Sequence, residues 1–197
     1  MEWVCPAASL VLAKRNNMIQ VPTIETERLL MRVPELSDFE PLCAFYASER
    51  AAFVGGQMER DKVWRHLALE IGHWQLLGYG RWTLVEKETG KPAGIIGLWN
   101  PEGWPEPEIG WDLFEGFGGK GYATEAATAA RTYAYETLGW TTAISLVDPN
   151  NHASRAVAQR MGASRDGDFT HVRMGTLEVW RHMSPDDLAA GGMEGYA

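Results

Sequence analysis

The chain has 197 residues, of which 45% are hydrophobic and 22% charged, and its formal net charge is −8. Such a chain is typical of one globular domain with a substantial core, and its negative charge argues against a nucleic-acid-binding surface and mildly favours cationic substrates. Neither the two cysteines nor the five histidines show metal-ligand spacing, and no apolar run is long enough to span a membrane, so we expect no metal, no nucleic acid and no membrane among the partners.

The first 20 residues contain one short apolar patch at residues 7–13, and Lys14 and Arg15 follow it. A signal peptide would carry its positive charge before the apolar region, not after it. We therefore interpret residues 1–20 as a flexible extension of a cytoplasmic protein.

A strand is expected at residues 26–33, and Pro34 ends it because proline cannot donate to a sheet ladder. Ser37 and Glu40 have the spacing of a capping box, which predicts the start of a helix there. The apolar positions of that helix are Phe39, Leu42, Phe45 and Tyr46.

A second helix is predicted at residues 63–77, because apolar residues recur along one side of it. These residues are Val63, Leu67, Ile71 and Trp74. His73 lies off this stripe, and we expect it at the surface or at the boundary of the core.

A hairpin follows the second helix. Its strands are expected at residues 81–86 and 92–98, joined by a turn in which Gly90 permits positive φ. The loop at residues 99–107 contains three prolines and two tryptophans. These tryptophans either cover the end of the sheet or line a binding site, since both uses are common for aromatic residues in loops.

The stretch at residues 106–129 predicts a strand, a glycine-rich turn and a helix. The strand at residues 108–113 alternates loosely, and residues 122–138 are rich in alanine with apolar positions at helical spacing. The turn between them contains Gly116, Gly118, Gly119 and Gly121. Glycines let the backbone approach a ligand closely and leave the first helical N–H groups open. Together with the helix dipole, these groups predict an anion site, typically for phosphate.

Two familiar phosphate-binding motifs fit this turn poorly. Gly116, Gly118 and Gly121 satisfy the dinucleotide pattern G-x-G-x-x-G. However, a Rossmann unit opens with a continuous apolar strand, whereas the strand before this turn carries two carboxylates. A Walker A loop requires Ser or Thr after Gly-Lys, and here Gly121 follows Lys120.

A third motif fits better. The run EIGW at residues 108–111, followed by GKGYATEA at residues 119–126, resembles the acyl-CoA pyrophosphate loop of the GNAT N-acetyltransferases, in particular the RimJ/RimL-type branch. The segments TERLLMR and SDFE near the amino terminus are also typical of that branch, so the resemblance covers most of residues 24–181. Two positions depart from the pattern: Gly118 stands where the branch usually has Trp, and Gly116 where the wider superfamily often has Gln or Arg.

The remaining elements follow in order. A strand is expected at residues 141–147 and a short helix at residues 155–161, which Gly162 closes. A final strand at residues 172–182 completes the sheet. Residues 184–197 are acidic and rich in Gly and Ala, and we interpret them as a flexible tail.

The resemblance implies one GNAT domain at residues 21–183. Its fold is a mixed α+β (α/β) arrangement with a central, mostly antiparallel sheet flanked by helices. The implied activity is transfer of an acetyl group from acetyl-CoA to a primary amine, either a protein N-terminus or a small molecule, by direct transfer in a ternary complex without a metal. The resemblance also allows a homodimer.

The resemblance further implies which residues hold acetyl-CoA. A strand splayed from its neighbour would offer free backbone groups around Trp111 and Leu113, and Asn151 and Ser154 would lie beside the thiol. The pyrophosphate would be held at Phe117, Gly118, Gly119, Lys120, Gly121, Tyr122, Ala123 and Thr124. For Asn151 and Ser154, an Asx turn and a helix cap are a sufficient structural explanation.

Acetyl transfer requires the amine to lose a proton, because a free α-amine has a pKa of about 8 and a lysine amine about 10.4. Glu108 occupies the strand position where several GNAT members keep a base, and its alternative is a solvated strand residue. Ser154 is the available hydroxyl for the leaving thiolate. Ala158 stands where many GNAT enzymes have a general-acid tyrosine. Two other functions therefore stay open: a CoA-binding module without turnover, and a Rossmann-type NAD(P)-binding oxidoreductase.

Overall fold

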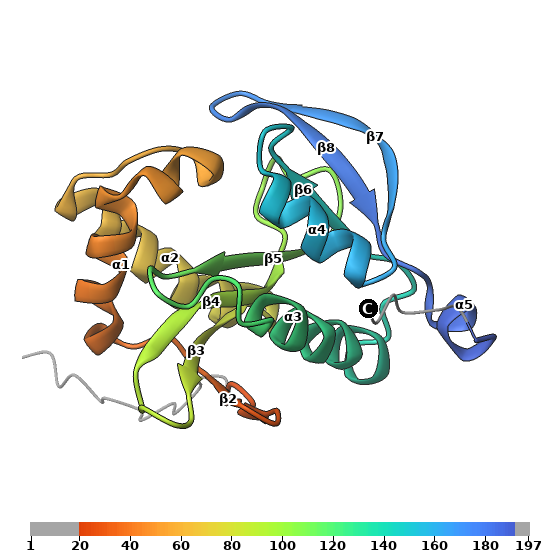
Figure 1. Ribbon diagram of the computed structural model, residues 1–197, viewed down its shortest axis with the longest axis horizontal. Coiled ribbons are helices and arrows are strands. Elements are labelled where there is room, and N and C mark those ends of the chain that lie inside the picture. Colours follow the sequence, from red (N-terminus) through yellow and green to blue (C-terminus); the bar gives the residue numbers. More distant parts are fainter. Residues whose placement is uncertain (1–19, 192–197) are drawn as a thin grey trace, which may run out of the picture.

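The computed structural model describes residues 20–191, and one eight-stranded sheet runs through this part of the chain in the order β1-β2-β3-β4-β5-β6-β8-β7 (Figure 1). Neighbouring strands pair antiparallel except β5 and β6, which are parallel. The strands are β1 Ile24–Glu25, β2 Leu29–Arg32, β3 Arg81–Glu86, β4 Pro92–Trp99, β5 Glu108–Leu113, β6 Ile144–Val147, β7 Ser164–His171 and β8 Gly175–Arg181. The predicted mixed fold with a mostly antiparallel sheet is confirmed, and the doubly wound parallel sheet of the Rossmann alternative is excluded.

Helices cover both faces of the sheet. They are the 3₁₀ helix Leu36–Asp38, α1 Phe39–Ala47, the 3₁₀ helix Glu49–Val54, α2 Arg60–Leu77, α3 Tyr122–Thr132 with a π-helical turn Tyr133–Thr137, α4 His152–Arg160 and α5 Pro185–Ala189. Successive side chains of a strand point to opposite faces. Accordingly, Ile95 of β4 packs in a cluster with α1 and α2, whereas Ile96 packs in the cluster that contains the alanine face of α3.

The start of α1 differs from the prediction. The residues of the capping box are Glu35 and Asp38, not Ser37 and Glu40, because a 3₁₀ turn precedes the helix. Oδ2 of Asp38 accepts from the Glu35 N–H at 2.9 Å and from the Thr83 hydroxyl at 2.7 Å. Asp38 also forms an ion pair with Arg32 at 2.7 Å, and its side chain is fully buried.

The prediction for His73 is wrong, because this side chain is buried. Its ring stacks on Trp99 with centroids 4.6 Å apart, and its Nδ1 lies 2.8 Å from the Tyr79 carbonyl oxygen. The end of α2 is thereby tied to β4, one of the strands on which α3 packs.

Strand β7 is missing from the sequence prediction. Its residues, SRDGDFTH, are exposed except for two half-buried positions, because β7 is an edge strand paired only with β8. A strand without a buried face has no apolar alternation to reveal it.

The carboxyl-terminal segment expected to be a flexible tail contains the short helix α5. Ser184 caps it by accepting from the Asp187 N–H at 3.2 Å, and Pro185 occupies its first turn. The expected amino-terminal extension at residues 1–20 lies outside the described residues apart from Gln20. Among the helices of residues 20–191, none is long and apolar enough to cross a bilayer.

The buried Asp38 carboxylate generates a stability prediction. Asp38→Ala leaves Arg32, Thr83 and the Glu35 N–H without their common acceptor, so we expect the free energy of unfolding in urea to fall by about 3 kcal/mol. The control is Asp61→Ala, which removes an exposed i,i+4 ion pair with Arg65 on α2 and should cost less than about 1 kcal/mol. Equal losses in the two variants would contradict the role given to Asp38.

Candidate active site

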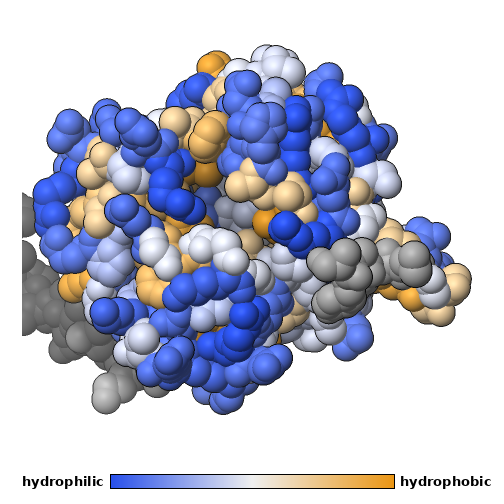
Figure 2. All heavy atoms as spheres, viewed as in Figure 1, coloured by the Kyte–Doolittle hydropathy of each residue, from blue (hydrophilic) through white to orange (hydrophobic). Residues whose placement is uncertain are grey.

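A cavity of about 1040 Å³ lies where β5, the start of α3, the first turns of α4 and the 3₁₀ helix Glu49–Val54 meet. Figure 2 shows this face of the molecule hollowed between the α1 side and the α4 side. The sequence-predicted residues that line it are Trp111, Leu113, Gly118, Gly119, Lys120, Gly121, Ala123, Thr124, Asn151 and Ser154. The other three predicted residues, Phe117, Tyr122 and Glu108, do not line the cavity.

One wall of the cavity is created by a fork between β5 and β6. These strands pair only at Glu108 and Ile144, after which β6 continues along β8. Close to the fork, the Ser145 hydroxyl donates to the Ile109 carbonyl at 2.6 Å. The part of β5 from Gly110 onward has no pairing with β6, and its last three residues line the cavity.

The glycine-rich turn forms the opposite wall. Gly119 and Gly121 have φ of 77° and 82°, a conformation that other residues rarely adopt. Gly121 is the N-cap of α3 and provides no side-chain bond to the helix, so the first N–H groups of α3 are open to an anion. Arg28 holds the turn by donating to the Lys120 carbonyl at 2.8 Å and to Glu125 at 2.7 Å.

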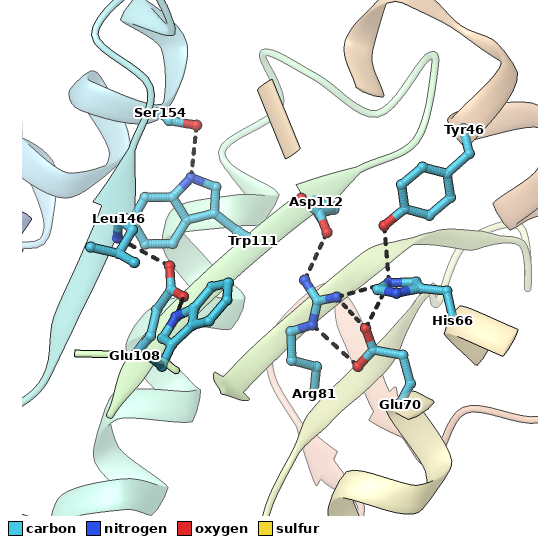
Figure 3. A network of polar contacts seen from close by, with 10 residues as sticks. Tyr46, His66, Glu70, Arg81, Glu108, Trp111, Asp112, Leu146 and Ser154 are labelled. Atoms are coloured by element: carbon cyan, nitrogen blue, oxygen red, sulfur yellow. Dashed lines mark hydrogen bonds and ion pairs between the residues drawn. The ribbon is translucent and has the colours of Figure 1, made fainter. Parts of the chain in front are cut away.

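Trp111 connects β5 to α4. Its indole N–H donates to the Ser154 hydroxyl oxygen at 3.1 Å (Figure 3). Asn151 is the N-cap of α4, since its Oδ1 accepts from the Ser154 N–H at 3.1 Å. The cap therefore belongs to Asn151 and not to Ser154, and the Ser154 hydroxyl hydrogen is available to donate towards the cavity.

Glu108 lies at the vertex of the fork and is buried, so its alternative as a solvated strand residue is wrong. One carboxylate oxygen accepts from the Leu146 N–H at 3.0 Å (Figure 3). The other accepts from the Trp104 indole N–H. Burial raises the pKa of Glu108 to about 7, although these two hydrogen bonds lower it in part. The Trp104 ring covers Glu108 and packs against His171, with centroids 5.3 Å apart.

A second polar cluster, which sequence reasoning missed, lies on the α1–α2 face of β5 (Figure 3). Arg81 bonds Glu70 and lies 2.7 Å from Asp112, and His66 lies 3.1 Å from Glu70 and 2.9 Å from the Tyr46 hydroxyl. Burial alone would raise the pKa of Glu70, but Arg81 and His66 outweigh it and lower the pKa to about 2. The charged residues at positions 81 and 112, both within predicted strands, were the available signal for this cluster.

Further cavity residues come from segments distant in sequence. The connection between α1 and α2 supplies Arg50, Phe53 and Val54, and α1 supplies Phe45. The turn before β2 supplies Arg28, and α4 supplies Arg160. Within residues 20–191, no group of His, Cys, Asp and Glu has the arrangement of a metal site.

Comparisons with known proteins agree with this geometry. Residues 28–164 match the model of the acetyltransferase (GNAT) domain. An acetyltransferase from Agrobacterium tumefaciens str. C58 has a similar structure, with a TM-score of 0.77 and 38% identity over 83% of this chain and 95% of its own. "Uncharacterized N-acetyltransferase p20" of Bacillus licheniformis is 27% identical over 80% of this chain and 93% of its own. The ribosomal-protein-S5-alanine acetyltransferase of Vibrio fischeri shares the fold, with a TM-score of 0.68 and 16% identity over 84% and 98% of the two chains.

The raised pKa of Glu108 generates a prediction on stability. An ordinary glutamic acid has a pKa of about 4.3, so between that value and about 7 the folded state binds more protons than the unfolded state. Stability therefore falls as pH rises through this window. Glu108→Gln removes this titration, so its unfolding free energy relative to the wild type should increase by about 2–3 kcal/mol between about pH 5 and about pH 8.

The measurement is urea unfolding of both proteins at the two pH values. Glu102→Gln, at an exposed position of the loop between β4 and β5, is the control variant, and the pH-dependent difference should be confined to Glu108→Gln. A Glu108→Gln difference that stays constant with pH would mean that the carboxylate does not titrate in this range.

Proposed function

Because the chain belongs to the GNAT acetyltransferase family, whose domain model matches residues 28–164, we propose that it transfers an acetyl group directly from acetyl-CoA to a primary amine. The observation that carries this proposal is that the open start of α3 and the fork between β5 and β6 border the same cavity. One end of the cavity suits an anion, and the other offers the backbone of β5, the strand that also carries the buried carboxylate Glu108.

The residues at the start of α3 fit a diphosphate. The amides of residues 117–124 would hold it, since Gly121 leaves the first helical N–H groups uncapped, and the side-chain atoms that come near the Cβ positions of Gly118 and Gly121 are those of two cationic guanidinium groups. The backbone of β5 around Trp111 and Leu113 would bind the pantetheine arm and place the thioester in the fork. Acetyl-CoA supplies the activated acetyl group, whose carbonyl oxygen needs an N–H donor as it gains charge.

The acceptor would enter beside the acidic cluster on the α1–α2 face. Asp112 lines the cavity, and the carboxylates of Asp112, Glu70 and Glu108 outnumber the one guanidinium of Arg81 that lies among them. This surplus favours a cationic amine. Glu108 does not line the cavity, so we propose that it takes the proton of the amine through a water molecule.

The pKa of Glu108 suits this role. A general base works best when its pKa lies near the working pH, and burial brings the pKa of Glu108 to about 7. The cationic amine first passes one proton by way of the water to Glu108, and the free amine nitrogen then bonds to the acetyl carbon. The second proton leaves the nitrogen as the amide forms and protonates the departing thiolate. As the carbon–sulfur bond breaks, the Ser154 hydroxyl donates to the thiolate, while its oxygen accepts from the Trp111 indole.

A CoA-binding module without turnover is the second candidate. Ala158 is fully buried and does not line the cavity, so α4 offers no acidic side chain at the position where the family often has tyrosine. We also propose that the acceptor is either a protein N-terminus or a small-molecule amine. A homodimeric state and a cytoplasmic location are further proposals.

Cofactor binding at the turn is tested with Gly121→Glu. The new side chain and its negative charge would enter the proposed diphosphate site, so CoA affinity in calorimetry should fall at least about 100-fold. Gly139→Glu is the matched control, because Gly139 also has positive φ, 71°, and no heavy atom lies within 4 Å of its Cβ position. Unchanged affinity in a folded Gly121→Glu protein would exclude the turn as the binding site.

The role of Glu108 is tested by the rate of thiol release from acetyl-CoA with an accepted amine. Glu108→Gln should lower the rate near neutral pH by about 10²–10⁴-fold, the usual contribution of a general base. The deficit should shrink as pH rises, since free amine then becomes abundant. A wild-type rate at every pH would remove Glu108 from the mechanism and leave it as a buried structural carboxylate.

A further inference from the structure

The basic side chains that border the cavity differ in what they contact. Arg28 bonds Glu125 and the Lys120 carbonyl, and Lys120 forms an ion pair with Glu86 at 3.0 Å. Both cations are thus occupied in holding the glycine-rich turn. Arg50 and Arg160 are exposed and have no carboxylate partner in the part of the chain that the structure describes, and of these two Arg50 is the one that lies beside the glycine-rich turn.

Arg50 reaches across the cavity from the 3₁₀ helix Glu49–Val54 to β5. Its Nε donates to the Leu113 carbonyl at 3.1 Å, which fixes one edge of the guanidinium. The other edge lies beside the turn: a Cβ on Gly118 would be 3.7 Å from Nη2 and 3.9 Å from Nη1. Within residues 20–191, neither of these nitrogens has a hydrogen-bond partner.

The position of this free edge determines what it can bind. It lies next to Gly118, three residues before the uncapped start of α3 at Gly121. A side chain at residue 118 would occupy the space that the guanidinium faces. Two nitrogens of a guanidinium form a planar fork that matches the oxygens of a phosphate, and the adjacent N–H groups of α3 attract the same charge.

We propose that Arg50 binds the diphosphate of CoA opposite the start of α3, so that the anion is held from two sides. This inference rests on the proposed function, since it requires CoA in the cavity. The turn that carries Arg50 also carries Phe53 and Val54, which line the cavity. The connection between α1 and α2 therefore contacts the bound cofactor as well as forming a wall of the remaining space.

The test is calorimetric titration of the full-length chain with CoA and with 3′-dephospho-CoA, which keeps the diphosphate but lacks the 3′-phosphate. Arg50→Gln should weaken both ligands about 10-fold or more, because it removes a charge-assisted contact. Arg50→Lys keeps the charge without the fork and should lose less. Arg65→Gln is the control, since Arg65 is exposed on α2 and paired with Asp61, and it should bind both ligands as the wild type does.

Each other outcome has a distinct meaning. A loss for CoA alone would assign Arg50 to the 3′-phosphate and overturn the proposal, and so would unchanged binding of both ligands. Equal losses of affinity in Arg50→Gln and Arg65→Gln would mean that the effect comes from the overall charge of the protein, and this result would also overturn the proposal. Failure of the wild-type protein to bind CoA would instead reject the proposed function itself.

Discussion

The divergence of β5 from β6 determines the remaining features of the site. Parallel pairing between the two strands is limited to Glu108 and Ile144, because β6 turns away to pair with β8. Unpaired backbone groups inside a protein are costly unless something satisfies them. The fold partly bridges the gap with side chains, since Ser145 donates to Ile109 and Trp111 donates to Ser154. Beyond these bridges, strand backbone faces a cavity in which a ligand can complete its hydrogen bonds.

Two buried carboxylates of this region, Glu70 and Glu108, lie in different environments. Glu70 lies against Arg81 and His66, which together outweigh burial and lower its pKa to about 2. Glu108 sits at the vertex of the fork and accepts hydrogen bonds from two neutral donors. Burial outweighs these bonds and the charge of Arg81 and raises the pKa of Glu108 to about 7. Where burial and charge partners differ this much, one carboxylate stays ionised and the other is able to exchange a proton near neutral pH. This contrast supports Glu108, rather than Glu70, as the group that accepts a proton.

The features that could be predicted from the sequence are those specified by residues close together in the chain. The glycine-rich turn, strand β5, the hairpin of β3 and β4, and the capping residue Asn151 are each specified by a few neighbouring residues, and all are present. Features that depend on distant packing were missed. Arg50 and Gly118 lie far apart in sequence, the partners of Arg81 come from α2 and β5, and the burial of His73 follows from its stacking on Trp99. Edge strand β7 lacked a buried face, and no local pattern marked it.

The central claim is that the cavity catalyses acetyl transfer and does not merely bind CoA. The most direct measurement is mass spectrometry of an amine panel incubated with acetyl-CoA and the wild-type protein, with CoA release followed in parallel. The panel should contain peptides with free N-termini, polyamines, amino acids and aminoglycosides. The account predicts at least one product heavier by one acetyl group, formed together with an equal amount of free CoA. Tight CoA binding without any acetylated amine across the panel would contradict it and favour a CoA-binding module.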